Sequence, residues 1–103
     1  VSPPACRRLR ALLERSIDSD QRRVDPENQV DGFLGEGLAE GTRLWSKAGW
    51  MSQARHDAAW WQQPDQPPVL VVAFCSGSDR SRDERLLPDL ARALNAYSSA
   101  SEG

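Results

Sequence analysis

The sequence predicts an α+β fold in which an antiparallel three-stranded meander is flanked by an N-terminal and a C-terminal helix. Three observations predict it. Apolar residues recur at helical spacing near both ends of the chain, three segments in the middle have strand character, and a proline-marked turn precedes the last of them. At 103 residues the chain makes at most one domain, so both helices must lie against the sheet to bury their apolar faces.

The N-terminal helix is predicted within residues 1–17. Ser2 offers a capping hydroxyl, and the two prolines that follow it are tolerated in a first helical turn. An apolar stripe at spacings of three and four predicts a packing helix; it comprises Cys6, Leu9, Leu13 and Ile17. Residues 18–41 are rich in Asp, Glu, Asn and Gly, which predicts an irregular connection with at most one short helical turn.

The three strands are predicted within residues 42–75, and their segments are Thr42–Ala48, Ala54–Trp61 and Val69–Cys75. Gly49 ends the first segment. The third is apolar at every position before its last residue, which is typical of an inner strand with both faces covered.

The C-terminal helix is predicted over residues 81–98, because leucines recur there at helical spacing. Ser81 and Glu84 have the form of a capping box. Pro88 conflicts with a long uninterrupted helix, so the helix either begins later than Ser81 or kinks near Leu87.

Composition excludes several classes of function. A formal net charge of -2 and a pI near 5.3 give no basic field, so nucleic acid is not an expected partner. The longest apolar run, Val69–Phe74, is far too short to span a membrane. The chain begins at Val1 and its single methionine is Met51, so we expect the natural start of translation to lie upstream. Cys6 and Cys75 lack metal-ligand spacing, which argues against a metal site and favours free thiols over a disulfide. No cofactor is expected.

Lys47 is the only lysine of a chain that otherwise uses arginine for fixed positive charge. A compact ammonium fits among hydroxyls and a carboxylate in a tight pocket, whereas a guanidinium is a wide planar fork. Composition alone leaves two explanations open: a site that needs an ammonium, or an arginine-biased sequence that kept one lysine by chance.

A family resemblance rests on four features in order along the chain: Lys47-Ala48-Gly49 on the first strand, Arg55-His56-Asp57-Ala58-Ala59 on the second, the apolar run Val69–Phe74 on the third, and a closing amphipathic helix. This combination resembles the C-terminal part of class A beta-lactamases and related penicillin-recognising serine hydrolases. The resemblance is best from Thr42 to Leu94. It implies that residues 1–103 form the C-terminal portion of a beta-lactamase-like domain, an incomplete part of that fold.

The resemblance implies roles for five residues. Lys47 would be the catalytic cation beside the nucleophilic serine, and the backbone amide of Trp50 would donate to the oxyanion hole. Ala48, Gly49 and Arg55 would contact substrate: the strand edge pairs with substrate amides, the glycine permits close approach, and the arginine holds a carboxylate. For Arg55 a surface ion pair is an equal alternative.

Departures from the family pattern limit what the chain does alone. Ala48 stands where the family has threonine or serine, and the chain contains neither Ser-x-x-Lys nor Ser-x-Asn. Without a nucleophile and its base there is no acyl-enzyme chemistry, so we expect this chain by itself to be inactive and the upstream part of its own chain to complete the site.

The substrate implied is a small molecule or a peptidoglycan-like chain, with a beta-lactam or peptide-like amide as the reacting group; a carboxypeptidase or esterase is the alternative within the class. The location implied by the family is periplasmic or secreted. A non-catalytic binding module is the alternative outside the class. It would use the strand edge and the tryptophans, which are Trp45, Trp50, Trp60 and Trp61.

The remaining suggestive residues favour structure over chemistry. His56 and Asp57 are neighbours on a predicted strand, so their side chains point to opposite faces and do not form an acid-base pair. The tryptophans border apolar strands, where core packing is commoner than a stacking platform for sugars or bases.

Overall fold

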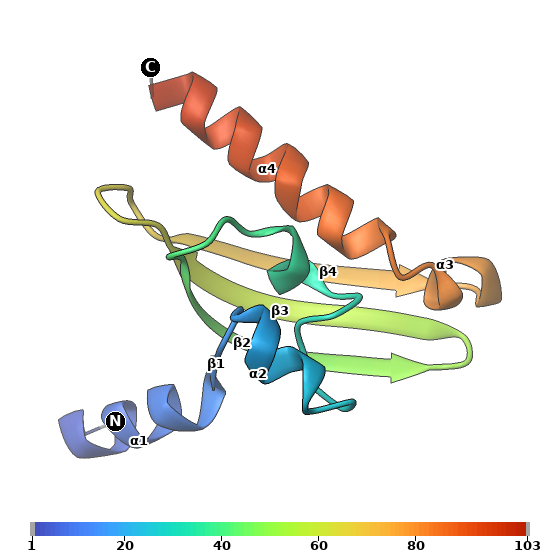
Figure 1. Cartoon of the computed structure of the whole chain (residues 1–103), viewed down its shortest axis with the longest axis horizontal. Coiled ribbons are helices and arrows are strands. Elements are labelled where there is room, and N and C mark those ends of the chain that lie inside the picture. The colour runs from blue at the N-terminus through green and yellow to red at the C-terminus, as the bar shows by residue number, and fades with distance from the viewer. Residues whose placement is uncertain (1, 103) are drawn as a thin grey trace.

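The computed structural model describes residues 2–102, with side chains described as far as Tyr97. An antiparallel sheet with the strand order β1-β2-β3-β4 lies between helical segments (Figure 1). The strands are β1 (Glu14–Arg15), β2 (Arg43–Met51), β3 (Ala54–Gln62) and β4 (Val69–Ser76). The helical segments are α1 (Pro3–Leu13), α2 (Ser19–Arg23), the 3-10 helix η1 (Leu34–Gly37), α3 (Ser78–Arg82) and α4 (Leu86–Glu102). The predicted α+β class is confirmed, and the two-residue strand β1 adds a fourth strand to the predicted three.

Alternation along the strands gives the sheet two distinct faces. The strands β2 and β3 form a tight hairpin in which Met51 pairs with Ala54, and β3 pairs with β4 in unbroken register. The core face carries the buried residues Leu44, Ser46, Ala48, Arg55, Asp57, Ala59, Trp61 and Ala73. The opposite face, called the open face below, carries Trp45, Lys47, Gly49, Met51, His56, Trp60, Leu70, Val72 and Phe74.

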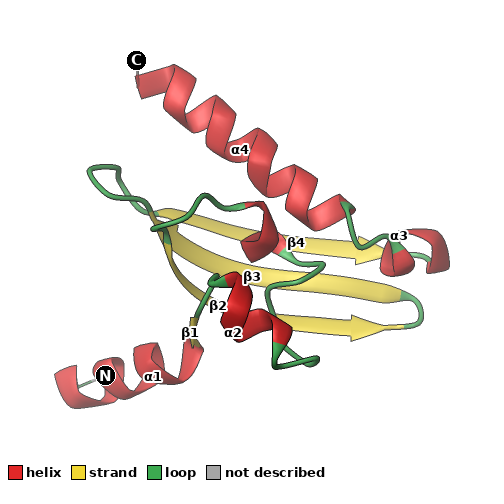
Figure 2. Ribbon diagram, viewed as in Figure 1, coloured by secondary structure: helices red, strands yellow, loops and turns green. Residues whose placement is uncertain are grey.

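The core face is covered by η1 and α4 (Figure 2). Leu34 of η1 and Leu87 of α4 are fully buried against it, and the indole of Trp61 donates a 3.0 Å hydrogen bond to Asn95 Oδ1 on α4. Two glycines permit this close packing. A Cβ on Gly35 would come within 2.6 Å of Leu44 Cδ2, and one on Gly37 would collide with the carbonyl oxygen of Pro88. The absence of side chains at Gly35 and Gly37 therefore allows η1 to lie close to both the sheet and α4.

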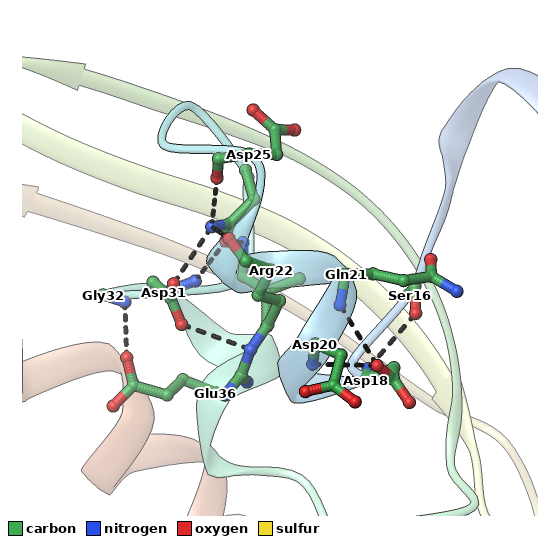
Figure 3. Close-up of polar contacts among 11 residues, drawn as sticks. Ser16, Asp18, Asp20, Gln21, Arg22, Asp25, Asp31, Gly32 and Glu36 are labelled. Atoms are coloured by element: carbon green, nitrogen blue, oxygen red, sulfur yellow. Dashed lines mark hydrogen bonds and ion pairs between the residues drawn. The ribbon is translucent and has the colours of Figure 1, made fainter.

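The connection 18–41 contains two short helical segments, α2 and η1, where one turn was predicted. Side-chain contacts hold it in place (Figure 3). Asp18 caps α2 by accepting from the amides of Asp20 and Gln21 at 2.9 and 3.1 Å. Arg22 and Asp31 form an ion pair of 3.3 Å. These contacts order the connection from Asp18 to Asp31 through its own side chains.

Within residues 2–102, β4 is covered on one face and not on both as predicted. β4 is the last strand of the sheet in the described chain, and it is its core-face residues that belong to the hydrophobic core. Its open-face side chains Leu70, Val72 and Phe74 are 73%, 54% and 77% exposed. The sequence is apolar on both sides of this strand, but residues 2–102 cover only one of them.

The prediction that α1 is a packing helix is also wrong. α1 has no buried residue, and Leu9 and Leu12 are 52% and 67% exposed. Its contact with the sheet runs through Arg10, whose guanidinium lies 5.3 Å from the Trp45 ring and 5.5 Å from the Trp60 ring on the open face. An apolar stripe predicts a helix but does not identify its partner.

The C-terminal helix begins at Leu86 rather than at Ser81. Ser81 lies within the separate short helix α3, so the predicted capping box does not form. Pro88 stands in the first turn of α4, where a missing backbone N–H leaves no helical hydrogen bond unmade. The later start, one of the two outcomes predicted for Pro88, is confirmed.

Candidate functional site

The candidate site is built on the edge of β2 that faces away from β3. Met51 and Ala54 close a two-residue hairpin and exchange hydrogen bonds, so the even-numbered residues of β2 direct their backbone groups toward the other edge. β1 pairs only with Leu44 and Trp45 there. Beyond that pairing, no strand among residues 2–102 covers the edge from Ser46 to Trp50.

Side chains occupy this edge one position after another. The Arg15 guanidinium donates from Nε to the carbonyl of Ser46 at 3.1 Å. The amide of Ala48 donates to Gln29 Oε1 at 2.8 Å, and Lys47 Nζ donates to the carbonyl of Ala48 at 2.6 Å. Arg15 also donates to Gln29 Oε1 at 3.4 Å, which steadies the amide side chain.

Trp50 is the next residue of β2 whose backbone N–H and C=O point to this edge. Its N–H differs from that of Ala48 because it has no hydrogen-bond acceptor in the described chain. The amide of Trp50, next to Gly49 and two residues beyond Ala48, is therefore an unoccupied backbone donor at this edge among the described residues.

Lys47 lies on the open face and is exposed, while its ammonium turns to the strand edge at Ala48. It forms no ion pair with any described residue. Gly49 follows it on the same face, and a Cβ added there would meet no atom within 4 Å. Lys47 and the open space over Gly49 are therefore adjacent and accessible.

A groove of about 390 Å³ runs along this end of β2. Its floor is formed by Ala48, Gly49, Trp50 and Arg55, and its wall by the connection before η1 together with Glu84. Four of the five predicted site residues therefore line one groove, and Lys47 projects beside it from the same strand.

Arg55 is buried on the core face, with 3% of its surface exposed. Its Nε donates to the Ser81 carbonyl at 2.8 Å and one terminal nitrogen donates to the Gly32 carbonyl at 3.0 Å. The guanidinium lies 4.8 Å from the Phe33 ring and 5.2 Å from the Trp50 ring. No carboxylate of the described chain pairs with it, so an uncompensated positive charge lies beneath the groove.

The Ser81 carbonyl that accepts from Arg55 also fixes the side chain of Trp50. Its indole Nε1 donates to the Ser81 carbonyl at 2.7 Å, and the Ser81 hydroxyl donates to the Ser52 carbonyl at 2.6 Å. Ser81 is fully buried. α3 is thereby tied to the hairpin and to the strand end that carries the unoccupied amide.

Asp57 lies one strand away from the edge and points into the core face, opposite to His56 as the alternation predicted. Its Oδ2 accepts from the Leu34 amide at 3.0 Å, while Oδ1 is buried without a partner in the described chain. Burial raises the pKa of Asp57 from 3.8 to about 6, against the opposing effects of the Leu34 amide and the charges of Arg15 and Lys47.

The pKa shift of Asp57 gives a pH-dependent stability. The native state holds the proton more tightly than the unfolded state, so this carboxyl stabilises the fold at low pH and loses that contribution as pH rises from about 3.8 to about 6. We expect Asp57→Asn to remove this dependence. Relative to the variant, the unmodified chain should gain up to about 3 kcal/mol in free energy of unfolding between pH 7 and pH 4, measured by urea unfolding. Asp65→Asn, at an exposed turn, is the control and should leave the profile unchanged; equal slopes for the chain and Asp57→Asn would contradict the expectation.

Sequence reasoning missed Gln29. It lies in an irregular connection, and its contact with Ala48 joins residues 19 positions apart through a loop path that no local pattern encodes. Cys6 and Cys75 are free thiols, as predicted. Within residues 2–102, no group of three metal-ligating side chains is placed to hold a metal, and no helix is long and apolar enough to cross a membrane.

Comparisons with known proteins identify the family and the fold of the chain. The family model described as "Beta-lactamase enzyme family" matches residues 1–98. A variant of the last common ancestor of Gram-negative bacteria class A beta-lactamase superposes with a TM-score of 0.72 at 22% identity, over 94% of this chain and 34% of that chain. A beta-lactamase from Xanthomonas campestris pv. campestris gives 0.68 at 24% identity over 91% and 32%. The structure of PBP-A gives 0.70 at 19% identity over 94% and 33%.

These superpositions establish a shared fold over nearly the whole of the present chain, which spans about a third of the length of each solved structure. A search of curated protein sequences finds no match.

Proposed function

The chain belongs to the beta-lactamase enzyme family, and from that premise we propose that it is the C-terminal portion of a serine hydrolase whose nucleophile lies upstream. The parent reaction is attack of a serine hydroxyl on the carbonyl carbon of a beta-lactam or peptide-like amide. The C–N bond breaks, the amine leaves with a proton, and water hydrolyses the acyl-enzyme.

The observation that carries this proposal is the unoccupied Trp50 amide at the end of a strand edge whose neighbouring Ala48 groups are bonded by side chains. A fixed backbone donor in a groove stabilises the oxyanion that forms during attack, because it needs no reorganisation when the charge develops. Gly49 lets the reacting carbonyl approach the strand, since no side chain stands over it.

Lys47 supplies the positive charge of the proposed site. Its ammonium bonds only a carbonyl of its own strand, so it is free to reorient toward a substrate carboxylate or a serine hydroxyl. Arg55 adds a second positive charge beneath the groove, where it attracts a substrate carboxylate. Ala48 contributes backbone groups alone, and a substrate amide must displace Gln29 to pair with them.

The open face supports a portion of a larger domain over a stand-alone binding module. Met51, Leu70, Val72 and Phe74 are each more than half exposed on one sheet face. Contiguous exposed apolar surface marks an interaction site, and the family structures extend well beyond the part that this chain matches. We propose that the upstream part of the same chain covers this face and brings the serine to Lys47.

The test is covalent labelling with a fluorescent penicillin. The gene is extended upstream of Val1, and the parent protein and the 103-residue chain are labelled side by side. We expect an upstream Ser-x-x-Lys and a labelled parent band, with no labelling of the shorter chain. A parallel assay with a thioester or depsipeptide separates a beta-lactamase from a carboxypeptidase or esterase. An upstream region without Ser-x-x-Lys, or a parent that neither probe acylates, would reject the proposal.

A further inference from the structure

The indole of Trp50 is anchored to another element of the fold, although this residue is 60% exposed. Its Nε1–H donates to the Ser81 carbonyl of α3 at 2.7 Å. Arg55, the residue directly opposite on β3, donates from Nε to the same oxygen at 2.8 Å. The guanidinium lies 5.2 Å from the Trp50 ring, so stacking adds to the hydrogen bond. An exposed aromatic ring is thereby held in one orientation.

The carbonyl that accepts both donors belongs to a residue that is itself held in place. Ser81 is fully buried, and its hydroxyl donates to the Ser52 carbonyl at 2.6 Å. A second hydrogen bond runs from the Gly77 amide to the Gln53 carbonyl at 2.8 Å. α3 is therefore bonded to both residues of the turn between β2 and β3, beside which it lies (Figure 1). The acceptor of the indole is a fixed point of the fold.

The backbone next to this anchor has few other contacts on its edge side. The peptide group between Gly49 and Trp50 carries the N–H that has no acceptor in the described chain. Gly49 adds conformational freedom before that peptide group because it has no Cβ. β1 ends its pairing at Leu44 and Trp45, so it does not reach this part of the edge. A fixed indole fixes the Cα–Cβ bond of its residue, and this restricts the direction of the N–H.

We propose that the Trp50 side chain and Ser81 are positioning residues that together aim the Trp50 amide into the groove. The inference rests on the proposed hydrolase function, in which this amide donates to the oxyanion. Neither the indole nor Ser81 takes part in making or breaking bonds. A misaligned donor stabilises the oxyanion less and leaves the contacts of the bound substrate nearly unchanged. The two residues therefore act on the acylation step and not on substrate binding.

The test is saturation kinetics of fluorescent penicillin labelling in the parent protein. These kinetics separate the first-order acylation constant from the dissociation constant of the initial complex. Trp50→Phe keeps an aromatic ring and removes the indole donor. We expect the acylation constant to fall roughly 10- to 100-fold, the loss typical of a slightly misplaced group. The dissociation constant should change less than about twofold, because ground-state contacts remain.

Trp61→Phe is the matched control, because it removes a hydrogen bond of the same kind outside the groove. The Trp61 indole donates to Asn95 Oδ1 at 3.0 Å, between β3 and α4. Both variants should lower the urea midpoint of unfolding, but Trp61→Phe should keep the acylation constant within about twofold of the unmodified parent.

Ser81→Ala tests the other half of the anchor, because it removes the hydroxyl that ties α3 to the turn. It should lower the acylation constant in the same direction as Trp50→Phe. Combining the two substitutions should cost little more than Trp50→Phe alone, since both act through one contact.

An unchanged acylation constant in Trp50→Phe, an equal fall in Trp61→Phe, or additive losses in the double variant would overturn the inference and leave the hydrolase function standing. If no probe acylates the unmodified parent, the hydrolase function fails, and the motion of the amide decides the role of the indole. The backbone ¹⁵N order parameter of residue 50 should then fall from about 0.85 in the parent to below about 0.6 in Trp50→Phe. It should stay constant in Trp61→Phe; equal values in the parent and Trp50→Phe would refute the positioning role.

Discussion

Lys47→Ala is expected to lower the acylation rate of the parent protein by about 10²- to 10³-fold, the loss typical of removing one preorganised group from an oxyanion site. The physical reason is the position of the ammonium. It projects from the open face to the edge beside the groove, and it has no carboxylate partner in the described chain that would neutralise it. The measurement is the time course of fluorescent penicillin or thioester labelling.

Two further variants show whether the acylation rate depends on the charge of Lys47, on the shape of its ammonium group, or on positive charge anywhere on this strand. Lys47→Arg keeps the charge, but its planar fork does not fit the place of a compact ammonium, so an intermediate rate is expected. Arg43→Ala removes a cation from the same strand and face, where the guanidinium pairs with Glu14 and stacks on Trp45 away from the groove. That control should keep nearly the full rate. Acylation of Lys47→Ala within about threefold of the unmodified parent would rule out the proposed role, because one lost donor typically costs far more.

Gly37→Ala is expected to lower the free energy of unfolding by about 3 kcal/mol, toward the upper end for an overpacked core. A Cβ there collides with the carbonyl oxygen of Pro88 and comes within 3.0 Å of Ala91 Cβ. The backbone of Pro88 cannot rotate away from the added methyl group, as a flexible side chain could. The collision therefore forces η1 and α4 apart, which would loosen the packing of Leu34 and Leu87.

Urea unfolding of the 103-residue chain measures this loss. Gly49→Ala is the matched control because its added Cβ meets no atom within 4 Å and its backbone is ordinary strand. It should change stability by less than about 0.5 kcal/mol, although in the parent protein its methyl group stands where the substrate must approach. An unchanged midpoint for Gly37→Ala would show that α4 is not held at this distance by η1.

Local pattern was sufficient for most of the strands, since alternation and turn residues identified β3 and β4 to within one residue and β2 except for its last three residues. The opposite orientations of His56 and Asp57 followed from the same rule. Which faces of the sheet are covered could not be predicted, because this depends on which helices and loops pack against each face. An apolar run such as Val69–Phe74 shows that a strand tolerates burial on both faces but does not show that both are covered.

The candidate site was likewise predicted only in part: local pattern indicated the strand that carries it, but not the contacts around it. The order of motifs put Lys47 on a strand that ends at Gly49, with Trp50 directly after it, whereas in the structure the strand continues to Met51 and includes Trp50. The contacts that distinguish the Trp50 amide from its neighbours join residues 19 to 31 positions apart, through Gln29, Arg15 and Ser81. They depend on register and on the path of the connection, and neither is encoded in local spacing.

The closed edge of β2 has a consequence for association between copies of the chain. A sheet with two unpaired edges can add strands at both ends and grow without limit, whereas natural sheets block at least one end. Here Arg15, Gln29 and Lys47 occupy the β2 edge, so β4 is the one long unpaired edge in the described chain. Edge-to-edge pairing between copies of this chain is therefore expected at β4 before β2, where an incoming strand must first displace three side chains.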